Sequence, residues 1–139
     1  MNWIIKLARF TLYLMAVGFV VNGAILLVSP DMNTTLFDIG VPTTTARVEV
    51  RGLGGLGMGT GLLFFMLARR PDWLRPAMLV LAAMMGGLVV GRTVGIIVDG
   101  PPNFFEYSQL ATEAFGLAVA LLTLWHLDRT NRQRKNNLS

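Results

Sequence analysis

The chain alternates between four long apolar runs and short polar segments. The runs predict membrane-spanning helices at about 8–28, 47–68, 76–98 and 104–127. Each is close to the roughly 20 apolar residues that an α-helix needs to cross the hydrocarbon core of a bilayer. Proline or glycine follows the first and third runs, where it stops a helix. The pattern therefore predicts an all-α integral membrane protein, a four-helix bundle.

The polar segments predict three connections of different kinds. Residues 31–46 hold a glycine, a proline and three consecutive threonines, which is typical of an extramembrane loop. Residues 69–75 form a tight basic turn, and Pro76 suits the first turn of the next helix. Asn103 is placed to cap the fourth helix, with Glu106 three residues later as its reciprocal partner in a capping box.

The chain is short enough for one domain. We expect the transmembrane bundle to occupy residues 1–128 and a polar, basic cytoplasmic tail to occupy residues 129–139. The tail has no apolar face to bury, so it is expected to fray.

Basic residues are distributed unevenly between the two sides of the predicted membrane. There are 12 lysines and arginines against 8 acidic residues, a net charge of +4. Four spans place both termini on the side of the middle turn, and nine of the 12 fall there: Lys6, Arg9, Arg69, Arg70, Arg75, Arg129, Arg132, Arg134 and Lys135. Cytoplasmic segments carry this excess, so both termini are predicted to be cytoplasmic. Because the basic residues lie at the ends of the apolar runs, they indicate membrane topology. No nucleic-acid partner is therefore expected.

Several kinds of chemistry lack the residues that they need. The chain has no cysteine and a single histidine, His126, which excludes disulfides, thiol chemistry and Cys- or His-cluster metal sites. Gly52, Gly54 and Gly57 fit a G-x-G-x-x-G pattern, but they lie in an apolar run and follow no strand, so a dinucleotide site is not expected. We predict no metal, no cofactor and no catalytic set.

Four charged residues that lie at similar depth in the predicted helices predict a polar cluster. Glu49 and Arg51 lie near the outer end of the second helix, Arg92 lies roughly 9 Å below the outer end of the third, and Glu113 lies in the fourth. An unpaired charge near the bilayer centre costs about 2.5–3.5 kcal/mol, whereas two acids and two bases can neutralise each other. Glu113 shares its helix face with Glu106. We expect Glu49, Arg51, Arg92 and Glu113 to gather in the outer half of the bundle.

Two interpretations of this cluster stay open. It is either an internal ion-pair network that fixes helix register or a binding site. As a site, the guanidinium and carboxylates would hold a carboxylate, phosphate or quinone-like head group while its apolar tail lies between helices. Glu49 and Arg51 point about 160° apart on a helix, so only one of them is expected to face the other charges.

Small and polar residues in the runs predict contacts between helices. Small residues let neighbouring membrane helices approach closely, and polar side chains hydrogen-bond between them. Asn22, the only strongly polar side chain inside the first run, is expected to make such a bond. The predicted packing glycines, within the bundle or between subunits, are Gly52, Gly55, Gly59, Gly87, Gly91 and Gly95.

These residues resemble a bacterial family of small four-span membrane proteins, domain of unknown function 4345, and more loosely DoxX-like proteins. The resemblance covers the chain apart from the tail and rests on four segments: Glu49-x-Arg51-Gly52-x-x-Gly55, Gly91-Arg92-x-x-Gly95, Asp99-Gly100 and Glu113. It implies a four-helix bundle in the bacterial inner membrane and brings no activity, substrate or cofactor. DoxX-like proteins are linked to quinone-associated oxidoreductase complexes.

Three functions fit the sequence. The first is a non-catalytic module, either an accessory subunit or a protein that binds a lipid or quinone-like ligand. The second is a small ion- or proton-coupled transporter or channel acting as an oligomer, because intramembrane carboxylates can relay protons. The third is a membrane enzyme acting on a lipid or quinone, with Glu113 as acid or base and Arg92 stabilising an anion. The expected partners are membrane lipids, further copies of the chain or a larger membrane complex.

Overall fold

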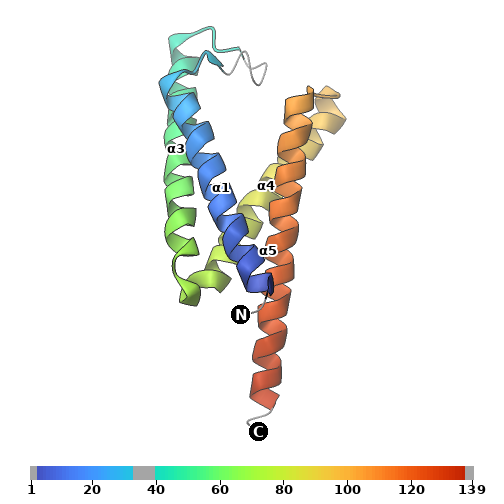
Figure 1. Cartoon of the computed structure of the whole chain (residues 1–139). Helices are drawn as coiled ribbons and strands as arrows, with labels where there is room; N and C mark the ends of the chain where they lie inside the picture. The colour runs from blue at the N-terminus through green and yellow to red at the C-terminus, as the bar shows by residue number, and fades with distance from the viewer. Residues whose placement is uncertain (1–2, 33–39, 137–139) are drawn as a thin grey trace.

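The protein is all-α in the computed structural model, which describes residues 3–32 and 40–136. Its elements are α1 (Trp3–Val28), α3 (Thr44–Ala68), the 3-10 helix η1 (Pro71–Trp73), α4 (Leu74–Asp99) and α5 (Phe104–Asn136). The four α-helices are long and apolar enough to cross a membrane, which confirms the predicted all-α architecture. α1 begins and α5 ends toward one end of the molecule, and the end of α1 and the start of α3 lie at the other (Figure 1).

Local sequence explains where the helices begin and end. Thr43 caps α3, because its side chain accepts a hydrogen bond from the Ala46 N–H at 3.1 Å. Gly100 follows α4 with a φ of 102°, a conformation that favours glycine. Asn103 caps α5, because its Oδ1 accepts from the Glu106 N–H at 3.0 Å. The other predicted contact of the capping box, from the Glu106 side chain back to the Asn103 backbone, is wrong. The Glu106 carboxylate pairs with Arg92 instead.

The helix bounds differ from the prediction in all four helices: α1 begins at Trp3 rather than at 8, and α4 spans Leu74–Asp99 rather than 76–98. α3 begins at Thr44, three residues before the predicted start, because the threonine run supplies the cap. α5 continues to Asn136, nine residues past the predicted end of the span. Up to that residue the tail is helical, where fraying was expected. The Asp128 carboxylate, near the predicted end of the span, pairs with Arg75 of α4 and ties this part of α5 to its neighbour. Of the predicted 31–46 loop, residues 33–39 lie outside the described part of the chain.

Helices α1 and α3 lie side by side and meet through glycines. A Cβ atom added at Gly23 would come within 2.6 Å of the Gly54 carbonyl oxygen, and one at Gly54 within 2.7 Å of the Gly23 oxygen. One added at Gly61 would come within 2.6 Å of the Ala16 oxygen. The two backbones therefore touch, as small residues permit in membrane helix pairs.

The glycines that make this contact are not the predicted ones. A Cβ added at Gly52, Gly55, Gly59, Gly87 or Gly91 meets no described heavy atom within 4 Å, and at Gly95 it meets only Asp99 Oδ2, at 4.0 Å. These glycines thus make no close helix contact within the described chain. Their predicted role in packing against another subunit stays a prediction.

The apolar core lies toward the end of the molecule that carries the termini. Its fully buried side chains come from the first half of α1, the last half of α3, the first half of α4 and Ala120 of α5, and include Leu12, Phe64 and Met78. Gly116 brings α5 into this core, because an added Cβ would lie 2.8 Å from the Met15 side chain. Beyond the core, the pair α1–α3 and the pair α4–α5 diverge toward the opposite end (Figure 1). That divergence shapes the site.

Candidate functional site

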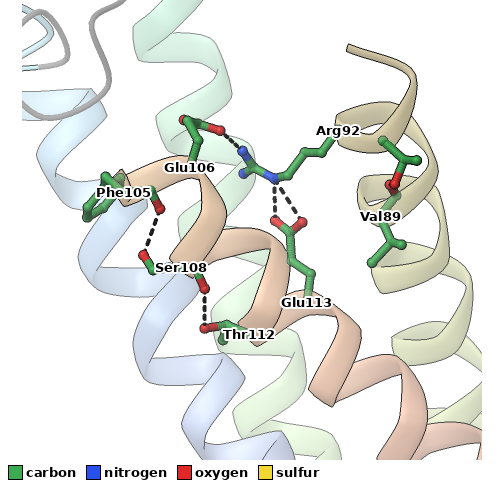
Figure 2. A network of polar contacts seen from close by, with 8 residues as sticks. Val89, Arg92, Phe105, Glu106, Ser108, Thr112 and Glu113 are labelled. Carbon is green, nitrogen blue, oxygen red and sulfur yellow. Dashed lines mark hydrogen bonds and ion pairs between the residues drawn. The ribbon is translucent and has the colours of Figure 1, made fainter. Parts of the chain in front are cut away.

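An arginine of α4 binds two carboxylates of α5 where the helix pairs diverge. The Arg92 Nε–H donates to both oxygens of Glu113, at 3.0 and 2.8 Å, and Nη1 donates to Oε2 of Glu106. Glu106 and Glu113 are seven residues apart, about two helical turns, so they share one face of α5. Figure 2 shows the guanidinium reaching from α4 between them. The three side chains thus join α4 to α5.

The cluster is partly withdrawn from solvent and carries more negative than positive charge. The Glu113 side chain is 8% exposed, Glu106 21% and Arg92 26%. One guanidinium faces two carboxylates, which leaves a net charge of −1 if all three are ionised. A guanidinium has five N–H donors, and three of those of Arg92 make no hydrogen bond with the described residues. The cluster therefore keeps donors available for a ligand.

Nearby hydroxyls on the same stretch of α5 are already occupied. Ser108 Oγ donates to the Phe105 carbonyl at 2.6 Å, and Thr112 Oγ1 donates to the Ser108 carbonyl at 2.9 Å (Figure 2). Such bonds back to the helix are usual for Ser and Thr in a span. The polar chemistry available to a ligand therefore comes from the charged side chains rather than from these hydroxyls.

Two of the three cluster residues, Arg92 and Glu106, line a cavity of about 530 Å³, which we call the Arg92 cavity. All four α-helices and the α4–α5 connection contribute to its lining. Its apolar side chains include Leu26, Val50, Leu53 and Ile96, and its polar ones are Asn22, Arg92, Asp99 and Glu106. Small-molecule sites are usually apolar clefts of about 300–1,000 Å³ with a few convergent polar groups, and this cavity has that form.

The structure brings together two of the four predicted cluster residues. Arg92 and Glu113 are joined as expected, whereas Glu49 and Arg51 are exposed on α3 and make no ion pair with the described residues. Their helix belongs to the other pair, which diverges from α4–α5 at this end (Figure 1). A four-membered cluster is therefore wrong for the described chain.

Three cavity residues were missed as site residues by reasoning from sequence. Glu106 was interpreted as a helix cap, although its seven-residue spacing from Glu113 placed both on one face. Asp99 was interpreted only as a helix stop. The interhelical hydrogen bond expected for Asn22 is not made among the described residues, and its side chain lines the cavity instead. These residues line a cavity because the two helix pairs diverge at this end of the molecule.

Comparison with known proteins identifies the family of the chain. A family model described as "Domain of unknown function (DUF4345)" matches residues 7–126, which includes every residue of the Arg92 cavity. No curated protein and no solved structure matches the chain. The match confirms the resemblance seen in the sequence.

Proposed function

The chain belongs to the DUF4345 family, and from that premise and the Arg92 cavity we propose that it binds a hydrophobic ligand without chemically altering it. The protein is then a small multi-pass module of the bacterial inner membrane, acting alone or as an accessory subunit. The observation that carries the proposal is a cavity lined by all four helices, apolar over most of its wall, with a few polar side chains on facing helices.

The proposed orientation has both termini in the cytoplasm. Nine of the 12 basic residues belong to the termini and the η1 turn, the pattern of the positive-inside rule. The Arg92 cavity is at the opposite end of the spans, near the α1–α3 and α4–α5 connections. In this orientation it lies in the periplasmic half of the membrane, where a molecule dissolved in the bilayer can enter between the diverging helix pairs.

The charges favour a neutral head group with an acceptor oxygen. An anion would meet the carboxylates of Asp99 and Glu106 in the lining, beside a single guanidinium that is already paired with Glu106 and Glu113. A carbonyl oxygen can instead accept from the N–H groups of Arg92 that have no partner among the described residues. Asn22 can donate or accept on the facing helix. A quinone-like head group with an apolar tail along Leu26 and Leu53 satisfies these groups.

A cavity-filling variant tests the proposal. Gly95 lines the cavity, and an added Cβ meets only Asp99 Oδ2, at 4.0 Å, so Gly95→Leu places a side chain in the space without displacing a helix. The wild-type protein is purified in mild neutral detergent and its extract analysed by mass spectrometry. We expect a hydrophobic ligand in fixed ratio to the wild-type chain, and its loss from Gly95→Leu.

The matched control is Gly91→Leu, one turn earlier on α4. Gly91 does not line the cavity, and a Cβ there meets no described atom within 4 Å, so the ligand should be retained. Retention in Gly95→Leu at the wild-type ratio, or no ligand above the detergent background in the wild type, would refute the proposal.

A further inference from the structure

A second cavity, of about 380 Å³, lies at the opposite end of the spans, beside the η1 turn. Two of its polar side chains are arginines on different helices, Arg9 of α1 and Arg75 of α4, and we call it the Arg9–Arg75 cavity. Asp72 and Asn131 also line it, together with apolar side chains that include Ile5 and Leu127. It shares no lining residue with the Arg92 cavity.

Each of the two guanidiniums is anchored by a hydrogen bond from its Nε–H. The terminal amino groups stay available to a ligand. The Arg9 Nε–H donates to the carbonyl oxygen of Ala68, the last residue of α3, at 3.0 Å. The Arg75 Nε–H donates to Oδ1 of Asp128 at 3.1 Å. The terminal amino groups of the two guanidiniums make no hydrogen bond with the described residues. Two anchored guanidiniums with free terminal N–H groups suit the oxygens of a phosphate.

The charge around this cavity is opposite in sign to that of the Arg92 cavity. Its lining holds two arginines against one aspartate, and three further basic residues adjoin lining residues in sequence: Lys6, Arg70 and Arg132. Asp128, the partner of Arg75, adjoins the lining residue Leu127. The excess of positive charge favours an anion, whereas the apolar side chains favour something with a hydrocarbon part.

We propose that the Arg9–Arg75 cavity binds the phosphate of an anionic phospholipid. Basic pockets between membrane helices on the cytoplasmic side are suited to such head groups. The terminal N–H groups of Arg9 and Arg75 hold the phosphate oxygens, Asn131 hydrogen-bonds the rest of the head group, and Ile5 and Leu127 contact the first part of the lipid chains. This site is independent of the ligand proposed for the Arg92 cavity, because the two cavities use different residues.

Native mass spectrometry of the whole chain in neutral maltoside detergent tests the site. The probes are dioleoylphosphatidylglycerol, which is anionic, and dioleoylphosphatidylcholine, which has the same acyl chains and no net charge. We expect the glycerol lipid to bind more tightly. Arg9→Gln and Arg75→Gln should each weaken it about fivefold, the effect of one basic side chain on an anionic lipid. Equal binding of the two lipids would overturn the proposal.

Two control variants separate a site from general attraction and from folding. Arg132→Gln removes an exposed positive charge next to Asn131 that does not line the cavity, so binding should change less than twofold. Asp128→Asn removes the negative charge beside Arg75 but keeps an oxygen that can accept the anchoring hydrogen bond from Arg75 Nε–H, so binding should hold or strengthen. An equal loss in Arg132→Gln, or a fivefold loss in Asp128→Asn, would show that the cavity does not bind the lipid.

Inorganic phosphate distinguishes a lipid from a soluble anion. Because the apolar part of the cavity contributes to lipid binding, phosphate at the concentration of the lipid should not displace it. Displacement by an equal concentration of phosphate would assign the two arginines to a soluble phosphate and overturn the lipid assignment.

Discussion

The two helix pairs are held together by different physical means. In the α1–α3 pair the backbones touch through Gly23, Gly54 and Gly61, and no side chain separates them at these points. In the α4–α5 pair, Arg92 at one end and Arg75 at the other bridge the helices to carboxylates of α5. Close backbone packing holds α1 to α3, whereas ion pairs hold much of α4 to α5. The first pair should therefore be sensitive to added side-chain volume, and the second to loss of charge.

This difference suggests which pair forms the stable part of the molecule. Close backbone contact cannot be adjusted by changing a rotamer, so α1–α3 is expected to behave as one rigid unit. Long charged side chains can accommodate small shifts between the helices that they join. The wall of the Arg92 cavity that carries the charges therefore belongs to the more adaptable pair, opposite a rigid wall formed by α1 and α3.

The largest expected effect comes from removing the cation of the α4–α5 pair. Arg92→Met leaves the Glu106 and Glu113 carboxylates without a counter-charge, and breaking a buried ion pair in this way costs about 3–5 kcal/mol. The measurement is equilibrium unfolding in mixed detergent micelles. A loss below about 1 kcal/mol, the range of exposed pairs, would show that charge does not hold α4 to α5.

Neutralising the whole cluster is the control for that variant. In the triple variant Arg92→Met, Glu106→Gln and Glu113→Gln, no uncompensated charge remains, and replacing a buried ion pair by neutral groups is often close to neutral in stability. We expect most of the loss to be recovered. A triple variant as unstable as Arg92→Met would mean that the arginine acts through packing rather than through charge.

The next effect tests shape in the α1–α3 pair. A Cβ at Gly54 would lie 2.7 Å from the Gly23 oxygen and 2.7 Å from the Leu27 nitrogen, so Gly54→Ala must push the helices apart. Overpacking of this kind costs about 1–3 kcal/mol. Unchanged unfolding of Gly54→Ala would contradict the close contact and remove the contrast between the two pairs.

The neighbouring glycine provides a matched control. Gly55→Ala adds the same methyl group one residue later, where it meets no described atom within 4 Å. Its higher helix propensity, about 1 kcal/mol relative to glycine, should leave the chain as stable or slightly more so. A loss of stability together with a smaller particle by size-exclusion chromatography would instead place Gly55 in a contact between subunits, as the sequence predicted.

The sequence was sufficient for the architecture and for half of the charge cluster. The number and order of the helices follow from the apolar runs, and the pairing of Arg92 with Glu113 follows from the cost of an isolated charge in lipid. The choice between neighbouring glycines did not follow. Gly54 and Gly55 differ only by rotation around one helix axis, and both faces of α3 are apolar, so the pattern does not say which face meets α1.

The same limit explains the outcome for Glu49, Arg51 and Glu106. Depth along a helix can be counted from sequence, so the predicted cluster gathered charges at similar depth. Which helices lie side by side at that depth depends on how the pairs diverge, and this is set by the glycines of α1–α3 and by the core around Phe64 and Met78. Charge patterns therefore predict candidate partners, whereas tight packing decides among them.

The smallest effect is expected at the other ion pair between α4 and α5. The Arg75 and Asp128 side chains are 51% and 47% exposed, and exposed pairs contribute about 0–1 kcal/mol. Asp128→Asn should therefore change the free energy of unfolding by less than 1 kcal/mol, with a difference from wild type that shrinks as salt screens the pair. The Arg92→Met loss should depend much less on salt, because its partner Glu113 is 8% exposed. If Asp128→Asn instead costs as much as Arg92→Met, the two ion pairs hold α4 to α5 equally, and exposure does not decide their contributions.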